Sequence, residues 1–127
     1  MPVESILASA SEGLNYERLR MEAASRNIAA ANVPVKPGEQ PTRWGVALAT
    51  PGQPGTLESL QQATGVRAVH DPSHPLADTN GMVHYPDTDM VREMTTLMTA
   101  SRGYEANVRS FNLMRSMVLR SLEIGAK

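Results

Sequence analysis

The chain has 127 residues, no cysteine, a formal net charge of −1 at pH 7 and only 4% aromatic residues. This composition fits one domain and excludes disulfides, thiol catalysis and cysteine-bound metal sites, and the near-zero charge gives no field to attract nucleic acid or an anionic membrane surface. Eight methionines supply flexible apolar side chains, which suit surfaces that repack against partners.

No apolar run approaches the roughly 20 residues that a membrane-spanning helix needs, so we expect no direct membrane span. The first residues also lack the basic stretch followed by an apolar one that marks an ordinary secretory signal. We therefore expect any export to proceed without a cleaved signal peptide.

Proline and glycine divide the chain into three parts. Eight of the nine prolines and six of the nine glycines lie between Pro34 and Pro86. Proline removes a backbone donor and clashes with the preceding turn, so long helices are expected outside that interval. The predicted single domain therefore comprises an N-terminal helix (1–32), a connector with short strands (33–86) and a C-terminal helix (87–127).

The N-terminal segment has the period of an amphipathic helix. Its predicted inner row follows steps of three and four: Leu7, Ala10, Leu14, Glu17, Met21, Ala24, Ile28 and Ala31. Most charges lie off this row, and the spacing is close to the 3.5-residue period of a coiled coil. Asn32 and Pro34 should end the helix.

The connector should be rich in loops. Three stretches are expected to form short strands, at residues 44–49, 65–70 and 82–85. Residues 51–55 read as a turn because they contain two prolines and two glycines, and residues 34–41 read as an extended linker.

The C-terminal segment repeats the helical pattern over a greater length. Its predicted inner row is Met90, Met94, Leu97, Ser101, Tyr104, Val108, Phe111, Arg115, Val118 and Leu122. Asp87 or Asp89 should cap the start, and Gly125 should end the helix. At about 1.5 Å per residue, some 36 residues reach roughly 54 Å, well beyond the roughly 30 Å diameter of a compact domain of this size.

These segments predict a mainly α fold, with two long terminal helices packed as an antiparallel coiled coil and joined by a short, loop-rich β connector. Further apolar residues lie off the C-terminal row, namely Val91, Met98, Met114, Met117 and Leu119. One helix pair cannot cover them all, so we expect other copies or related chains to supply the missing surface. We also expect the terminal helices to be only partly ordered in the free monomer.

Two glycines in the expected helices allow two interpretations. Gly13 and Gly103 each cost about 1 kcal/mol relative to alanine. Either that cost is tolerated, or each glycine permits a close approach of the helices that a side chain would block.

Histidines and carboxylates, the residue types that bind metal ions, are grouped in one stretch of the connector: His70, Asp71, His74, Asp78 and His84. They lie in a proline-broken loop without the helical spacing of known zinc motifs, so we predict no metal and no cofactor. His74 and Asp78 are instead expected to bond backbone groups. No nucleophile elbow or phosphate loop occurs, so we predict no enzymatic activity. A metal-dependent hydrolase is the alternative, which metal analysis of the purified protein would test.

Several short stretches carry a family resemblance. Towards the C-terminus the chain reads D-P-S-H-P-L-A-D (71–78), G-M-V (81–83), E-M (93–94) and A-S-R-G-Y-E-A-N-V (100–108). Towards the N-terminus it reads S-E-G-L (11–14), R-L-R-M (18–21), N-I-A-A-A-N (27–32) and Q-P-T-R (40–43). In type and spacing these residues resemble the bacterial flagellar basal-body rod protein C (FlgC) family. The short connector favours this family over hook and distal-rod proteins, which carry larger middle domains.

The resemblance implies a structural subunit of the proximal rod, which polymerises through its terminal helices with other flagellar rod proteins and copies of itself to transmit torque. It also implies passage through the flagellar type III export apparatus to the basal body in the periplasm. The alternative is an export adaptor or chaperone-like helical module of a type III secretion apparatus, which would be a stable helical dimer in solution.

The predicted assembly interface draws on both helices. It comprises Leu14, Met21, Asn27, Ile28, Asn32, Met94, Leu97, Arg102, Tyr104, Asn107, Val108 and Phe111. Tyr104 has two interpretations: it packs against the first helix of its own chain, or it anchors a contact between subunits, where Tyr and Arg are enriched.

Overall fold

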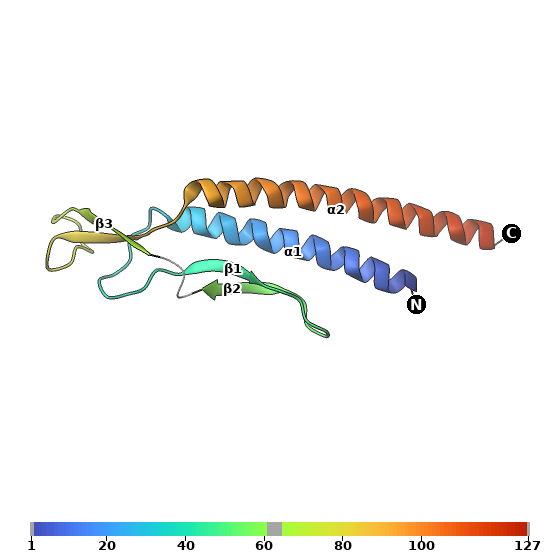
Figure 1. The fold of residues 1–127 in the computed structure, drawn as a ribbon, viewed down its shortest axis with the longest axis horizontal. Helices are drawn as coiled ribbons and strands as arrows, with labels where there is room; N and C mark the ends of the chain where they lie inside the picture. Colours follow the sequence, from blue (N-terminus) through green and yellow to red (C-terminus); the bar gives the residue numbers. More distant parts are fainter. Residues whose placement is uncertain (1, 61–64, 127) are drawn as a thin grey trace.

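The computed structural model describes residues 2–60 and 65–126. Two long antiparallel helices, α1 (Pro2–Ala30) and α2 (Met90–Gly125), run side by side, and both chain ends lie at the same end of the molecule (Figure 1). A small β region joins them, so the fold is mainly α, as predicted. Residues 1, 61–64 and 127, which the predicted three-part division includes, lie outside the described residues.

Both helices end close to the expected positions. Pro2 can start α1 because the first turn needs no backbone donor, and α1 ends at Ala30, before Pro34. Of the two predicted caps for α2, Asp89 is the one used: its Oδ1 accepts from the Arg92 backbone N–H at 3.1 Å. Gly125 is the last residue of α2, and Ala126 follows it in a right-handed conformation.

The first hairpin pairs β1 (Arg43–Ala47) with β2 (Thr56–Leu60) in antiparallel register, and it lies along α1 on the side away from α2 (Figure 1). The predicted turn at 51–55 lies within the connection, where Thr50 and Gln53 exchange backbone hydrogen bonds. Strand β2 was not predicted, because its sequence T-L-E-S-L does not alternate apolar and polar residues.

The second hairpin pairs β3 (Val66–His70) with β4 (Met82–Pro86) and projects beyond the helices at the connector end (Figure 1). Both strands match predicted stretches to within about a residue. The predicted linker contacts this hairpin, because the Val35 backbone N–H donates to the His84 carbonyl oxygen at 2.8 Å. All five residues of β3 are exposed.

The buried residues gather near the connector. Among the described residues, those with little exposure are Leu19, Ala23, Ala24, Asn27, Ala31, Pro41, Val83, Pro86, Glu93 and Ala100. We call this part the core end. Residues 2–18 of α1 and 101–125 of α2 contain no buried residue, and we call them the open end. Stability is therefore concentrated at one end of an elongated molecule.

At the core end, the most buried positions of α2 lie one residue before the predicted inner row, whereas at the open end Tyr104, Val108, Phe111 and Val118 of that row are half-buried. Glu93 and Ala100 are 4% and 0% exposed, whereas Met94 is 52% exposed. A Cβ atom at Gly103 would lie 2.8 Å from Glu17 Cδ, so this position also faces α1. The prediction counted apolar side chains, but the two buried positions of α2 are a charged residue, Glu93, and a small one, Ala100.

Candidate assembly interface

Asn27 fastens the first hairpin to α1. Its side-chain Nδ2 donates to the Trp44 carbonyl oxygen at 2.9 Å, and its Oδ1 accepts from the Trp44 backbone N–H at 2.8 Å. The amide thus pairs with β1 as a neighbouring strand would, satisfying both backbone groups of Trp44. The Arg26 guanidinium lies 4.6 Å from the centre of the Trp44 ring. Asn27 is only 4% exposed, so little of its side chain is left for a neighbouring subunit.

An ion pair connects the same hairpin to α2. Arg43 of β1 donates from Nε and Nη2 to Glu93 Oε1, at 3.2 and 3.0 Å. The Glu93 side chain is 5% exposed and that of Arg43 is 32% exposed. A carboxylate buried this deeply needs a partner, because an unpaired charge would be costly in the protein interior. The pair therefore joins β1 to α2, and together with the Asn27–Trp44 hydrogen bonds it links the hairpin to both helices at the core end.

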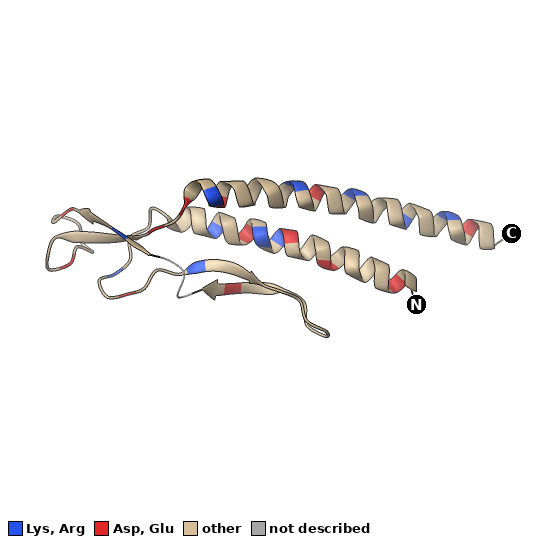
Figure 2. Cartoon of the chain, in the orientation of Figure 1, with Lys and Arg blue, Asp and Glu red and all other residues tan. Residues whose placement is uncertain are grey.

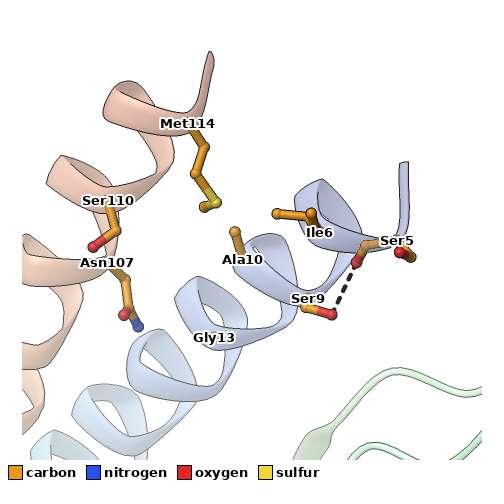
Figure 3. A pocket seen from close by; sticks show the side chains of 8 residues that line it. All are labelled: Ser5, Ile6, Ser9, Ala10, Gly13, Asn107, Ser110 and Met114. Carbon is orange, nitrogen blue, oxygen red and sulfur yellow. Dashed lines mark hydrogen bonds between the residues drawn. The ribbon is translucent and has the colours of Figure 1, made fainter. Parts of the chain in front are cut away.

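The open end is packed more loosely. A groove of about 390 Å³ runs between the two helices there. Figure 3 shows its lining, with Met114 and Ile6 reaching towards the space and serines and alanine around it. Asn107 crosses towards Gly13, where a Cβ atom would come within 3.2 Å of its Nδ2. Both glycines face the other helix, and a side chain at Gly13 or Gly103 would have to displace Asn107 or Glu17.

Many large apolar side chains on the helices remain exposed. Those more than 40% exposed are Val3, Ile6, Val91, Met94, Met98, Leu113, Met117, Leu119, Leu122 and Ile124. Most belong to α2, which has seven more residues than α1 and extends past it at the open end (Figure 1). Burying such side chains contributes about 1.5–3 kcal/mol each. The helices therefore present extensive apolar surface that this chain does not cover itself.

The residues predicted for the assembly interface fall into three groups. Asn27 is buried, and three are exposed: Asn32, Met94 and Arg102. The half-buried ones are Leu14, Met21, Ile28, Leu97, Tyr104, Asn107, Val108 and Phe111. Sequence reasoning did not single out Val3, Ile6, Leu113 or Ile124, and it identified neither the Asn27–Trp44 pairing nor the Arg43–Glu93 ion pair.

The loop between β3 and β4, at residues 71–81, which we call the histidine loop, is held in place by the carboxylate of Asp78. Asp78 Oδ1 accepts from the backbone N–H groups of Asn80 and Met82 at 2.8 and 2.9 Å, and Oδ2 lies 2.9 Å from His84 Nε2. The hydrogen bond from Met82, followed by that from His84, lowers the pKa of Asp78 below its ordinary value of 3.8. His74 Nδ1 accepts from the Leu76 backbone N–H. Both residues thus bond backbone groups, as predicted.

The described residues contain no group of three or more His, Asp or Glu side chains placed to hold a metal ion. Within the same residues, no helix is long and apolar enough to cross a membrane.

Comparison with known proteins gives consistent results along the chain. Residues 79–124 match the family model described as flagellar basal body rod FlgEFG protein C-terminal. Over 133 residues the chain is 33% identical to flagellar basal-body rod protein FlgC of Salmonella typhimurium, covering 98% of this chain and 99% of that protein. It is 29% identical to FlgC of Agrobacterium fabrum over 97% of this chain and 95% of that protein. FlgC of Bacillus subtilis is 42% identical over a shorter stretch, covering 45% of this chain and 38% of that protein.

Proposed function

This chain belongs to the flagellar basal-body rod protein FlgC family, and we propose that it builds the rod by packing the exposed faces of its terminal helices against neighbouring subunits. It is a structural subunit of the rod and not an enzyme. The observation that carries the proposal is the distribution of burial. The core end holds the buried residues, while the open end leaves large apolar side chains in water.

Covering the exposed apolar side chains would contribute a free energy that is a sizeable fraction of the stability of a single domain. Leu113, Met117 and Leu122 alone are 59–64% exposed. Covering half of each would contribute roughly 1 kcal/mol per side chain, against a typical domain stability of about 5–15 kcal/mol. We infer that the open end is only partly ordered in the free chain and that its helices continue as an antiparallel coiled coil when neighbours pack against them.

The predicted interface residues keep their proposed role where their side chains are accessible. Met94 and Arg102 are exposed, and Tyr104 is half-buried, which leaves part of its ring for a second subunit. Partners are other flagellar rod proteins and copies of this chain, and the assembled rod transmits torque. The three-part division of the chain, into two terminal helices and a connector, matches this proposal.

Export through the flagellar type III apparatus and assembly in the periplasm complete the proposal. A chain whose long helices are only partly ordered before assembly is suited to passage through a narrow channel in an unfolded state. The alternative, an export adaptor or chaperone-like module, is not favoured, because the relatives matched over nearly the full chain carry the name of a rod protein.

A deletion and complementation experiment tests the proposed function. A strain lacking this chain should be non-motile, with rods that stop before completion, and the wild-type chain should restore motility. Tyr104→Ala should still be exported but should be depleted from purified basal bodies. Tyr85→Ala, on the second hairpin, is the matched control and should be incorporated. A motile deletion strain with complete rods would contradict the function, and normal incorporation of Tyr104→Ala would contradict the anchor role alone.

A further inference from the structure

A second line of side chains runs along α2, opposite the face that meets α1. It comprises Val91, Met98, Arg102, Arg109, Leu113 and Arg120, which we call the outer row, and all six are exposed. The steps are seven and four residues, so they follow one line along a helix with 3.6 residues per turn. Val91 and Met98 each lie two residues, about 200° around the helix, before the buried Glu93 and Ala100. Helix α2 therefore has one face that packs against α1 and an opposite face that is exposed.

The outer row combines apolar and basic groups. Val91, Met98 and Leu113 are 76%, 60% and 63% exposed. None of the ion pairs formed among the described residues involves Arg102, Arg109 or Arg120. Two exposed glutamates, at 105 and 123, flank the row. An apolar line that also carries three cations is suited to a surface that offers small side chains and carboxylates.

Helix α1 of the same chain offers such a surface at its open end. Residues 2–17 contain three glutamates and no lysine or arginine. Figure 2 shows only acidic segments along this half of α1, whereas basic segments recur along α2. Glu17 is paired with Arg20 at 3.1 Å, but Glu4 and Glu12 are exposed and have no ion pair among the described residues. Between them lie the exposed small residues Ala8 and Ser11.

We propose that the outer row of α2 docks on this acidic face of α1 in a second copy of the chain. The two complementary faces belong to the same chain but point in different directions, so they cannot meet within one copy. The partner that fits both is therefore a second copy of the chain. Such a contact is heterologous, so it repeats from copy to copy and produces a ring or a helical array rather than a closed dimer. The proposal rests on the proposed function in one respect, that copies of the chain meet in the rod.

The dimensions of the two faces agree. Glu4 and Glu12 are eight residues apart, about 12 Å along α1, while Arg109 and Arg120 are eleven residues, about 16.5 Å, apart along α2, a difference that long arginine side chains can span. The bulky Leu113 would lie over small side chains, as in ridges-into-grooves packing. Leu48, at the end of the first hairpin, is 72% exposed and lines a groove with Glu12, which adds apolar surface beside this face.

Cysteine crosslinking tests the pairing directly, because the chain has no cysteine of its own. Cells carry the double variant Ala8→Cys/Leu113→Cys, and basal bodies are purified after mild oxidation. A heterologous contact predicts a ladder of disulfide-linked dimers, trimers and larger species, since each copy links to two others. Either single variant should remain monomeric. The matched control Gln53→Cys/Leu113→Cys places the first cysteine on the exposed hairpin turn and should give no ladder.

A charge reversal tests the electrostatic part. Adding Arg109→Glu to the double cysteine variant should reduce the yield of crosslinked species about fivefold, as expected when one surface attraction becomes a repulsion of similar size. Adding Glu12→Arg as well should restore the yield. A merely structural effect of Arg109→Glu would not be rescued by a substitution on the other helix.

The remaining outcomes each decide the proposal. Incorporation of the double variant into rods without a ladder would overturn the pairing and leave the rod function intact. Dimers from Leu113→Cys alone, or a disulfide to a different protein, would also overturn it. If the wild-type chain is also absent from basal bodies, the proposed function as a rod subunit is wrong. The ladder formed by concentrated purified double variant would then decide the pairing separately.

Discussion

Replacing Asn27 by Ala tests how the first hairpin is held to α1. The substitution removes the hydrogen bonds at 2.9 and 2.8 Å to the carbonyl oxygen and N–H of Trp44. Each bond contributes about 1 kcal/mol, and leaving a part-buried backbone group unpaired costs about 1 kcal/mol more. Alanine regains roughly 0.6 kcal/mol of helix propensity. We therefore expect the free energy of unfolding to fall by about 2–3 kcal/mol.

Urea unfolding followed by the fluorescence of Trp44, the one tryptophan in the chain, measures this loss where it occurs. Asn112→Ala is the matched control: Asn112 is exposed on α2 and makes no side-chain hydrogen bond among the described residues, so it changes only helix propensity. If the free energies of unfolding of the two variants differ by less than about 0.5 kcal/mol, the Asn27–Trp44 pairing does not hold the hairpin to α1.

Three further predictions concern the helix contact, the ion pair and the histidine loop. Gly103→Leu should lower the free energy of unfolding by about 1–2 kcal/mol because the new side chain displaces Glu17 of α1, whereas Gly125→Leu, whose added Cβ meets nothing within 4 Å, should be neutral in the same urea titration. Arg43→Met should cost about 1–3 kcal/mol by leaving the Glu93 carboxylate unpaired, and adding Glu93→Gln should recover part of the loss; additive losses in this double-mutant cycle would contradict the ion pair. Folding lowers the pKa of the Asp78 carboxyl, so its ionised form stabilises the fold at any pH above the ordinary pKa of 3.8, and this stabilisation is lost as the pH falls through the lower pKa of the folded state. Asp78→Asn should therefore be less stable than wild type at pH 7, and the difference should shrink below about pH 3.8. An unchanged difference in melting temperature from pH 7 to pH 3 would contradict this role of Asp78.

Sequence periodicity predicted the long helices well because proline and glycine mark their limits. Helix α1 starts at Pro2 and ends before Pro34, and α2 starts after Asp89. Strand β2 was not predicted because its burial does not alternate along the strand. Only Leu57 and Leu60 are half-buried, and the other three residues are exposed. Its place is fixed by pairing with β1, a tertiary contact that local sequence does not encode.

The face of α2 was harder to predict than its length, whereas every residue of the predicted inner row of the N-terminal segment is buried or half-buried. A row of apolar residues passes through Met94 and Leu97, yet the buried position is Glu93, which needs Arg43 from a strand 50 residues away in the sequence. Ala100 and Gly103 bring the helices together because they are small. Likewise, a buried asparagine such as Asn27 looks like an interface residue until its partner strand is known. Partners distant in sequence decide such positions.

Hydrogen exchange of the free chain at low concentration tests the central claim most directly, because it reports the local stability of each stretch of helix. If neighbouring subunits are needed to order the open end, amides of residues 2–18 and 101–125 should exchange quickly. Those of residues 19–30 and of the start of α2, up to Ala100, should be protected by the core end. Uniformly slow exchange along both helices of the isolated chain would show that it orders its own open end, and would contradict the account.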